Sequence, residues 1–263
     1  MDKTCHTVPM MLVANSCLSA LLCASDILWI SIATLINDVK QIEYQNLFCI
    51  FCGYLTYASC AVLNYSFLLQ AFYRYMIVVC PTRSFWQLPQ SQLLLIVLTW
   101  IYVLIFPTGF IFTGDIIYNM DNQICQIPLR FSFAIIFAVL CVYIIPVSIT
   151  MFIYYKLVRF IHQMNQRIIP VNTLVRARRE LKMFRRTVTL LMIIFILDFP
   201  YALFIFISFF NAAPKYHFRI AYIFIDIALA CVMIVLFQFT DPLKTSILKK
   251  LNIELEMVAL TES

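Results

Sequence analysis

Six long apolar stretches constrain this chain of 263 residues more than any other feature of its sequence. They cover roughly residues 10–36, 47–79, 93–113, 129–158, 187–210 and 220–240, and each is long enough to cross a bilayer as a helix. Only 12% of the residues are charged and 63% are hydrophobic, which excludes a water-soluble domain. The stretches are apolar throughout rather than alternating, which excludes a transmembrane β-barrel. The sequence therefore predicts an all-α fold, a polytopic membrane helical bundle of six spans within residues 1–242.

The end of the chain has a different pattern. After Pro242, one helical face is apolar and the lysines lie off it; the apolar positions are Leu243, Ile247, Leu248 and Leu251. This pattern is typical of an amphipathic helix that lies in the headgroup region of a membrane. We expect residues 243–263 to form such a short helix on the cytoplasmic side, followed by a tail.

The lysines and arginines indicate how the bundle is oriented. Fifteen of the 19 lie on one side, which comprises the N-terminus, the 74–92 turn, the 156–186 connection and the C-terminal tail. Because basic residues gather on the cytoplasmic side, both termini are expected in the cytosol. The net charge of +6 then belongs to a face that contacts lipid headgroups and protein partners, and it does not indicate nucleic-acid binding.

Ten cysteines are present, and their predicted positions separate them into groups. Six fall inside spans, where cysteine behaves as a small apolar residue. Cys49 and Cys125 are the two expected at the outer face, which is the oxidising side of the membrane. We predict that Cys49 and Cys125 form a disulfide.

Several residues form an ordered set along the chain. They are Leu22 and Asp26; Cys49; Tyr73-Arg74-Tyr75 followed by Pro81; Trp100 with Pro107; Cys125; Pro146 with Tyr154; Glu180 and, twenty residues on, Pro200; and Asp241-Pro242. In order and spacing this set resembles the rhodopsin-like (class A) G-protein-coupled receptors, lacking their first transmembrane helix. The six spans resemble the second to seventh helices of that family. A truncated, non-signalling receptor fragment remains an open alternative.

The resemblance implies a function and a switch region. It implies a multi-pass receptor of the plasma membrane, not an enzyme, that passes an extracellular ligand signal to heterotrimeric G proteins. The residues implied in coupling and switching are Tyr73, Arg74, Tyr75, Tyr154, Glu180, Asp241 and Pro242. Arg74 and Glu180 are expected to pair at the inner ends of two helices. Tyr73 stands where the family has an acid, so Arg74 lacks a neighbouring carboxylate, and we predict elevated basal activity.

The resemblance also implies a ligand pocket that opens outward. Its residues are Thr56, Tyr57, Cys60, Asp198, Tyr201 and Cys231. Asp198 is the candidate counter-ion for a cationic group. Because Thr56 stands where amine receptors carry an aspartate, a peptide is favoured, and an amine or another small molecule stays open. Residues 220–239 contain no lysine for a Schiff base, which excludes retinal.

An acidic residue within a membrane span carries a free-energy cost in lipid, so its presence indicates a functional or structural role. The resemblance implies that Asp26 and Asp241 face each other and, with Ser59, hold a sodium ion as an allosteric modulator; no other cofactor is expected. The alternative is that each acid is protonated or bonded to a neighbouring helix. A six-span transporter or channel is the other class weighed, but the spans carry few polar residues and no repeat.

Overall fold

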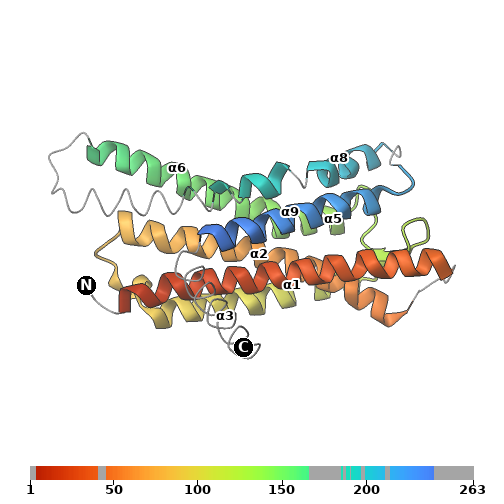
Figure 1. Cartoon of the computed structure of the whole chain (residues 1–263), viewed down its shortest axis with the longest axis horizontal. Helices are drawn as coiled ribbons and strands as arrows, with labels where there is room; N and C mark the ends of the chain where they lie inside the picture. Colours follow the sequence, from red (N-terminus) through yellow and green to blue (C-terminus); the bar gives the residue numbers. More distant parts are fainter. Residues whose placement is uncertain are drawn as a thin grey trace, which may run out of the picture.

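The computed structural model describes residues 4–40, 46–165, 185, 188–189, 191–196, 199–210 and 214–239. Among those residues, six helical segments are long and apolar enough to cross a membrane, and they run side by side along the longest axis of the molecule (Figure 1). The predicted helical membrane bundle is confirmed. The expected amphipathic helix over 243–263 lies outside the described residues.

Within the described residues, the spans contain the following α-helices, joined by shorter elements. The helices are α1 (Thr4–Lys40), α2 (Leu47–Val79), α3 (Pro89–Ile105), α4 (Thr108–Phe112), α5 (Phe133–Val139), α6 (Ile145–Asn165), α8 (Phe199–Ser208) and α9 (His217–Phe239). A 3₁₀ turn, η1 (Ser84–Gln87), precedes α3, and a π-helical turn, η2 (Leu140–Ile144), joins α5 to α6.

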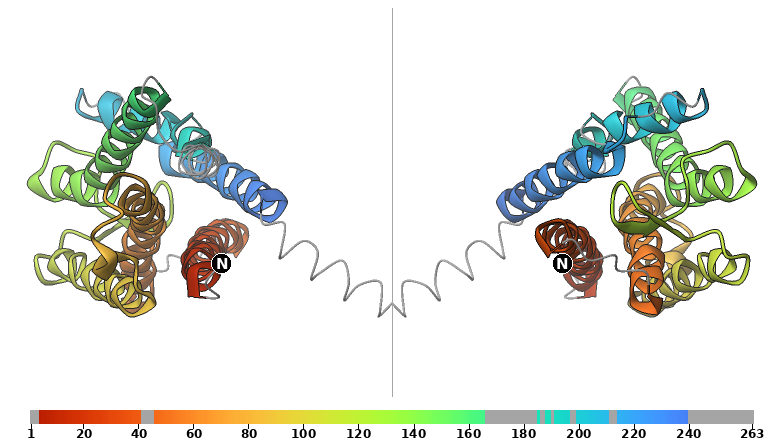
Figure 2. Two further views of the ribbon diagram at one scale, coloured as in Figure 1. Left: turned by 90° about the vertical axis from the view of Figure 1, so that its left-hand side faces the viewer. Right: turned by 90° about the vertical axis from the view of Figure 1, so that its right-hand side faces the viewer.

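Helix α2 lies at the centre of the arrangement. Seen along the bundle, α1, α2 and α3 form one side and α6, α8 and α9 form the other (Figure 2). Helix α2 contacts α1, α3 and α6, and it is the most buried of the six spans. Asn46 caps its first turn, because the Asn46 side-chain oxygen accepts a hydrogen bond from the Cys49 N–H at 2.9 Å.

Prolines explain where two spans depart from a regular helix. Pro107 separates α3 from α4, since proline has no N–H to donate and its ring clashes with the preceding turn. Pro146 follows the π-helical turn, where the Val142 carbonyl accepts a hydrogen bond from the Asn64 side-chain amide at 3.0 Å. An irregular turn inside a membrane helix is tolerated when a neighbouring helix satisfies its backbone in this way.

Polar side chains connect the helices on the α1–α3 side. The Gln70 amide donates to the Ser16 hydroxyl at 2.6 Å, which joins α2 to α1. The Trp100 indole N–H donates to the Asn15 side-chain oxygen at 3.0 Å, which joins α3 to α1. Hydrogen bonds between helices of this kind stabilise packing in lipid, where apolar contacts alone give little driving force.

A short β-hairpin lies at the end of the bundle where α1 ends and α2 begins. Strands β1 (Ile117–Asn119) and β2 (Ile124–Gln126) are antiparallel, and Tyr118 pairs with Cys125. The turn between them contains Gln123 with a φ of 53°. The sequence reasoning predicted no strands here.

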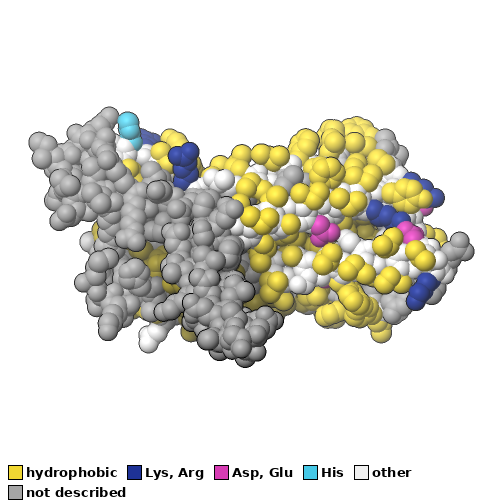
Figure 3. Space-filling model, in the orientation of Figure 1, with side chains coloured by type: hydrophobic (Ala, Val, Ile, Leu, Met, Phe, Trp, Pro, Cys, Tyr) yellow, Lys and Arg dark blue, Asp and Glu magenta, His cyan; other side chains and the backbone are white. Residues whose placement is uncertain are grey.

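The outer surface of the bundle is apolar. Hydrophobic side chains cover most of the visible described surface, and most of the visible charged ones lie towards its two ends (Figure 3). Large side chains such as Leu35, Phe152 and Phe206 are more than half exposed. A surface of this kind is compatible with lipid rather than water.

Candidate functional site

The hairpin is joined to α2 by a disulfide. Cys49 and Cys125 are bonded, with their Cα atoms 5.4 Å apart, as the sequence predicts. One turn further along α2, Gly53 lies directly beneath β2. A Cβ atom at Gly53 would lie 2.2 Å from the Cys125 carbonyl oxygen, so only glycine permits this close approach.

Three of the predicted ligand-pocket residues lie together in the bundle interior. Tyr57 is buried, and Tyr201 and Cys60 are half-buried side chains that pack against the same hydrophobic cluster. The Tyr57 hydroxyl also accepts from the Ile127 N–H at 3.3 Å, which holds it beneath the hairpin. Ring packing continues from Tyr201 to Phe218, with the ring centres 6.4 Å apart.

The other predicted pocket residues have separate surroundings. Thr56 is buried and donates to the Cys52 carbonyl at 3.0 Å. Cys231 is half-buried on α9, and Asp198 lies outside the described residues. The structure therefore groups Tyr57, Cys60 and Tyr201, while the complete pocket stays a prediction.

Asp26 is buried in the middle of α1, with 6% of its surface exposed. Its Oδ2 atom has no hydrogen-bond partner among the described residues. The hydroxyl of Ser59, on α2, donates to the Thr56 carbonyl at 3.2 Å. An oxygen with a spare lone pair suits a hard cation such as sodium. Asp241 lies outside the described residues, so the sodium site stays a prediction.

The Tyr73-Arg74-Tyr75 triplet divides between two packing clusters at the other end of α2. Tyr73 is 3% exposed and packs against apolar side chains of α1 and α3, including Leu12 and Ile96. Tyr75 packs towards α6 in a cluster that also contains Tyr154. Arg74 lies between them and is half-buried. The remaining predicted switch residues, Glu180, Asp241 and Pro242, lie outside the described residues.

Two polar contacts between α1 and α9, one of them an ion pair, were not predicted from the sequence. The Arg219 guanidinium binds both carboxylate oxygens of Asp38, with one of the two distances at 2.9 Å. The Ser31 hydroxyl donates to Asp226 at 3.2 Å. Both contacts join α1 to α9. Asp226 is an acid within an apolar stretch, and that signal alone would have marked it alongside Asp26.

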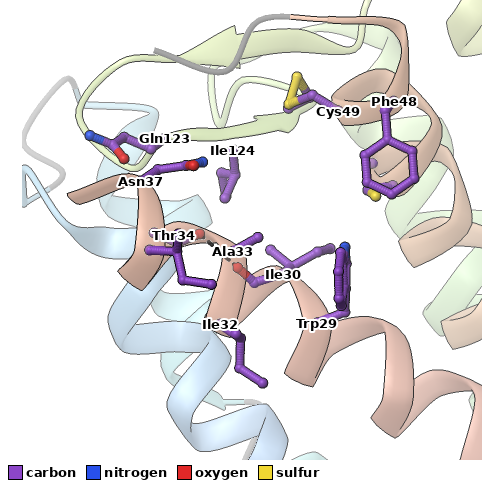
Figure 4. Close-up of a pocket in the computed structure, with 14 residues that line it drawn as sticks. Trp29, Ile30, Ile32, Ala33, Thr34, Asn37, Phe48, Cys49, Gln123 and Ile124 are labelled. Carbon is purple, nitrogen blue, oxygen red and sulfur yellow. Dashed lines mark hydrogen bonds between the residues drawn. A yellow bond between two sulfur atoms is a disulfide. The ribbon is translucent and has the colours of Figure 1, made fainter. Parts of the chain in front are cut away.

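A cavity of about 220 Å³ lies between α1, α2 and the hairpin (Figure 4). Its lining residues are Trp29, Ile30, Ile32, Ala33, Thr34, Ile36, Asn37, Phe48, Cys49, Cys52, Gly53, Gln123, Ile124 and Cys125. The lining is mostly apolar and includes the disulfide. None of the predicted ligand-pocket residues belongs to it.

The family described as "7 transmembrane receptor (rhodopsin family)" matches residues 1–242. The chain belongs to the rhodopsin family of seven-transmembrane receptors. No curated protein matches it at the level of an individual relative. The family is one of receptors rather than enzymes, and the Cys49–Cys125 disulfide of this receptor lies at the hairpin end of its bundle.

Proposed function

We propose that this receptor lies in the plasma membrane and passes a signal from an extracellular ligand to heterotrimeric G proteins. The observation that carries the proposal is the construction of α2. This helix is bonded to the hairpin through Cys49 at one end and carries Arg74 at the other. At ~1.5 Å per residue the two positions lie roughly 37 Å apart, the depth of one bilayer core and its edges.

The surroundings of Arg74 suggest how the inner end changes. Tyr75 and Tyr154 pack in one cluster between α2 and α6, so movement of α6 away from α2 opens the side of α2 next to Arg74. A G protein would bind at that opening. We propose that Glu180 pairs with Arg74 in the resting state, as the family resemblance implies. Because Tyr73 provides no carboxylate, fewer groups hold Arg74, and basal activity is expected to be high.

The proposed ligand binds on the side of the hairpin, and both chain termini face the cytosol. Tyr57, Cys60 and Tyr201 form the described part of the proposed site, and Asp198 supplies its counter-ion. A peptide is the favoured class, with an amine or another small molecule as the alternative. This orientation follows the basic residues, which gather on the connections at the Arg74 end.

Basal signalling tests the proposal without a known ligand. Cells expressing the receptor are assayed for activation of each G-protein class, with surface expression measured in parallel. We expect output above that of mock cells, and we expect Arg74→Ala to reduce it to the mock level. Arg83→Ala is the matched control, because Arg83 is an exposed arginine in the turn after α2 and should leave basal output unchanged.

Two outcomes would contradict the proposal. Wild-type output equal to mock cells in every G-protein class, at normal surface expression, favours the non-signalling alternative. Equal loss in Arg74→Ala and Arg83→Ala shows that charge at the membrane face, rather than Arg74 itself, determines the output.

We also propose sodium as an allosteric modulator bound at Asp26, Ser59 and Asp241. The unpartnered Oδ2 atom of buried Asp26 supports it. Basal output should fall as potassium in the medium is replaced by sodium, and Asp26→Asn should remove this dependence. A sodium response that persists in Asp26→Asn contradicts the site.

A further inference from the structure

Two cysteine thiols meet in the interior of the bundle. The Sγ atoms of Cys23, on α1, and Cys60, on α2, lie 3.5 Å apart, although the two residues are 37 positions apart in the chain. Neither takes part in the Cys49–Cys125 disulfide. The sulfur atoms of a disulfide are about 2.04 Å apart, so the two thiols need to approach by only about 1.5 Å to form one.

The thiol pair lies away from the hairpin, within the apolar core. At ~1.5 Å per residue, Cys60 lies roughly 16 Å along α2 from Cys49. Cys23 is 1% exposed and belongs to the hydrophobic cluster that also contains Tyr57. Cys60 is half-buried and packs against the same cluster. A charged reagent would lose its hydration on reaching these sulfur atoms, so the position favours a small, uncharged reactant.

The surroundings of the pair do not favour a bound metal ion. Structural zinc sites use four protein ligands, and catalytic ones use three. Among the described residues, no group of three or more histidine, cysteine, aspartate or glutamate side chains could hold a metal ion. Two adjacent thiols without further ligands favour a covalent bond between the sulfur atoms instead.

The difference in exposure between the two thiols sets an order of reaction with a peroxide, ROOH. Cys60 is the more accessible thiol, so its sulfur attacks one peroxide oxygen and the O–O bond breaks. The products are the sulfenic acid of Cys60 and the alcohol or water ROH. The Cys23 sulfur then attacks the Cys60 sulfur, the S–O bond breaks, and water leaves as the disulfide forms. The two thiols lose two electrons, and the peroxide gains them.

We propose that Cys23 and Cys60 form a site of reversible oxidation, at which a small uncharged peroxide converts the two thiols into a disulfide between α1 and α2. Apolar surroundings slow the first step, because a thiol there is rarely ionised. The second step is fast by comparison, because the contact between the two sulfur atoms makes it intramolecular. The bond joins α1 to α2 directly, whereas the Cys49–Cys125 disulfide joins α2 to the hairpin. The proposal does not require the receptor to signal.

Differential alkylation of the purified receptor in nanodiscs tests the site, with hydrogen peroxide as the probe. After treatment, acid stops thiol exchange, and the remaining thiols are alkylated with light N-ethylmaleimide in denaturant. The protein is then reduced, and the released thiols receive the heavy reagent. Peptide mass spectrometry measures the heavy fraction at each cysteine. We expect the heavy fractions at Cys23 and Cys60 to rise together and by equal amounts, and we expect a disulfide-linked pair of their peptides before reduction.

Two variants separate the roles of the two thiols. Cys60→Ser removes the thiol that reacts first, so Cys23 should stay in the light form. Cys23→Ser leaves Cys60 without a second thiol, so the sulfenic acid of Cys60 should accumulate and be trapped by dimedone. Cys17→Ser is the matched control, because Cys17 is a half-buried cysteine of α1 and its loss should leave the oxidation of the pair unchanged. Thermal stability is checked in each variant, and the linked peptides of the wild type need no variant.

The outcomes decide between the proposal and its alternatives. Light label at both cysteines after peroxide, while a cysteine peptide in the same sample is oxidised, overturns the proposal and leaves the pair as apolar packing. Heavy label at Cys23 that persists in Cys60→Ser shows that Cys23 has another partner. Peroxide-dependent dimers on non-reducing gels that disappear in Cys60→Ser place the bond between two receptors, which also overturns the proposal. Absence of G-protein output affects none of these measurements, so failure of signalling and failure of this site are distinguishable.

Discussion

Arg219 and Asp38 form a two-pronged ion pair that joins the beginning of α9 to the end of α1. Two guanidinium nitrogens bind the two carboxylate oxygens, and the guanidinium carbon also lies 5.1 Å from the centre of the Tyr216 ring. The side chains of Arg219 and Asp38 are 26% and 35% exposed. Paired contacts of this geometry are stronger and more directional than single ones. The pair fixes the hairpin end of α9 against α1.

A double-mutant cycle on Arg219→Gln and Asp38→Asn should show this coupling. We expect a coupling free energy of about 1 kcal/mol from thermal unfolding of the purified receptor, since the pair is bidentate but partly exposed to solvent. The Lys215–Asp121 pair is the internal control, because its atoms are 3.5 Å apart and both side chains are more than half exposed. Equal coupling for the two pairs would show that geometry and burial do not matter here.

Gly53→Ala should displace the hairpin. The new Cβ would meet the Cys125 carbonyl oxygen at 2.2 Å, and the backbone of β2 has no flexible end that can move aside. We expect a loss of stability of ~1–3 kcal/mol, measured by thermal unfolding, with slower formation of the Cys49–Cys125 disulfide. Gly109→Ala is the control, since nothing lies within 4 Å of its Cβ position. Similar losses in both variants would contradict the close approach at Gly53.

Loss of the disulfide should destabilise the receptor at the hairpin end. The bond closes a loop with a sequence separation of 76 residues. Cys49→Ser, Cys125→Ser and the double variant should each lose about 2–4 kcal/mol by the same thermal assay, and the two single losses should not add. Alkylation of the denatured, unreduced wild type should leave Cys49 and Cys125 unmodified by mass spectrometry. Modification of both would refute the bond.

Tyr73→Asp tests whether a carboxylate at position 73, where the family has an acid, can form an ion pair with Arg74. We expect it to destabilise the receptor by roughly 2 kcal/mol or more, because position 73 faces an apolar cluster of α1 and α3 rather than the arginine. Tyr73→Phe keeps the ring and should cost much less. Thermal unfolding and surface expression measure both. A Tyr73→Asp receptor with normal stability and lower basal output would instead show that the acid reaches Arg74.

The spans were predictable because hydropathy is continuous along each of them. The predicted 47–79 stretch coincides with α2, which the Asn46 cap and the turn after Val79 bound sharply. The predicted 10–36 stretch is too short, since α1 runs from Thr4 to Lys40. Hydropathy detects the part of a helix that contacts lipid, whereas backbone hydrogen bonds continue into polar ends. The hairpin was not predictable from alternation, because all three residues of β2 are buried.

The site was predictable only where a local property identified a residue. Cys49 and Cys125 were paired correctly because the oxidising side of the membrane left one pairing. Asp38 and Arg219 gave no such signal, since each is an ordinary charged residue at the end of a span. Their contact joins residues 181 positions apart and depends on α1 and α9 lying side by side. The cavity likewise depends on how α1, α2 and the hairpin meet.

The divided environment of Tyr73 and Tyr75 makes α2 mechanically asymmetric. Tyr73 anchors the helix to α1 and α3, where hydrogen bonds from Gln70 and Trp100 reinforce the same side. Towards α6, Tyr75 packs in a cluster of mainly apolar rings and aliphatic side chains. A displacement of α2 that begins at the hairpin is therefore expected to meet more resistance from the hydrogen-bonded α1 and α3 side than from the apolar contacts with α6. We therefore expect α1, α2 and α3 to move together, and α6 to shift relative to α2.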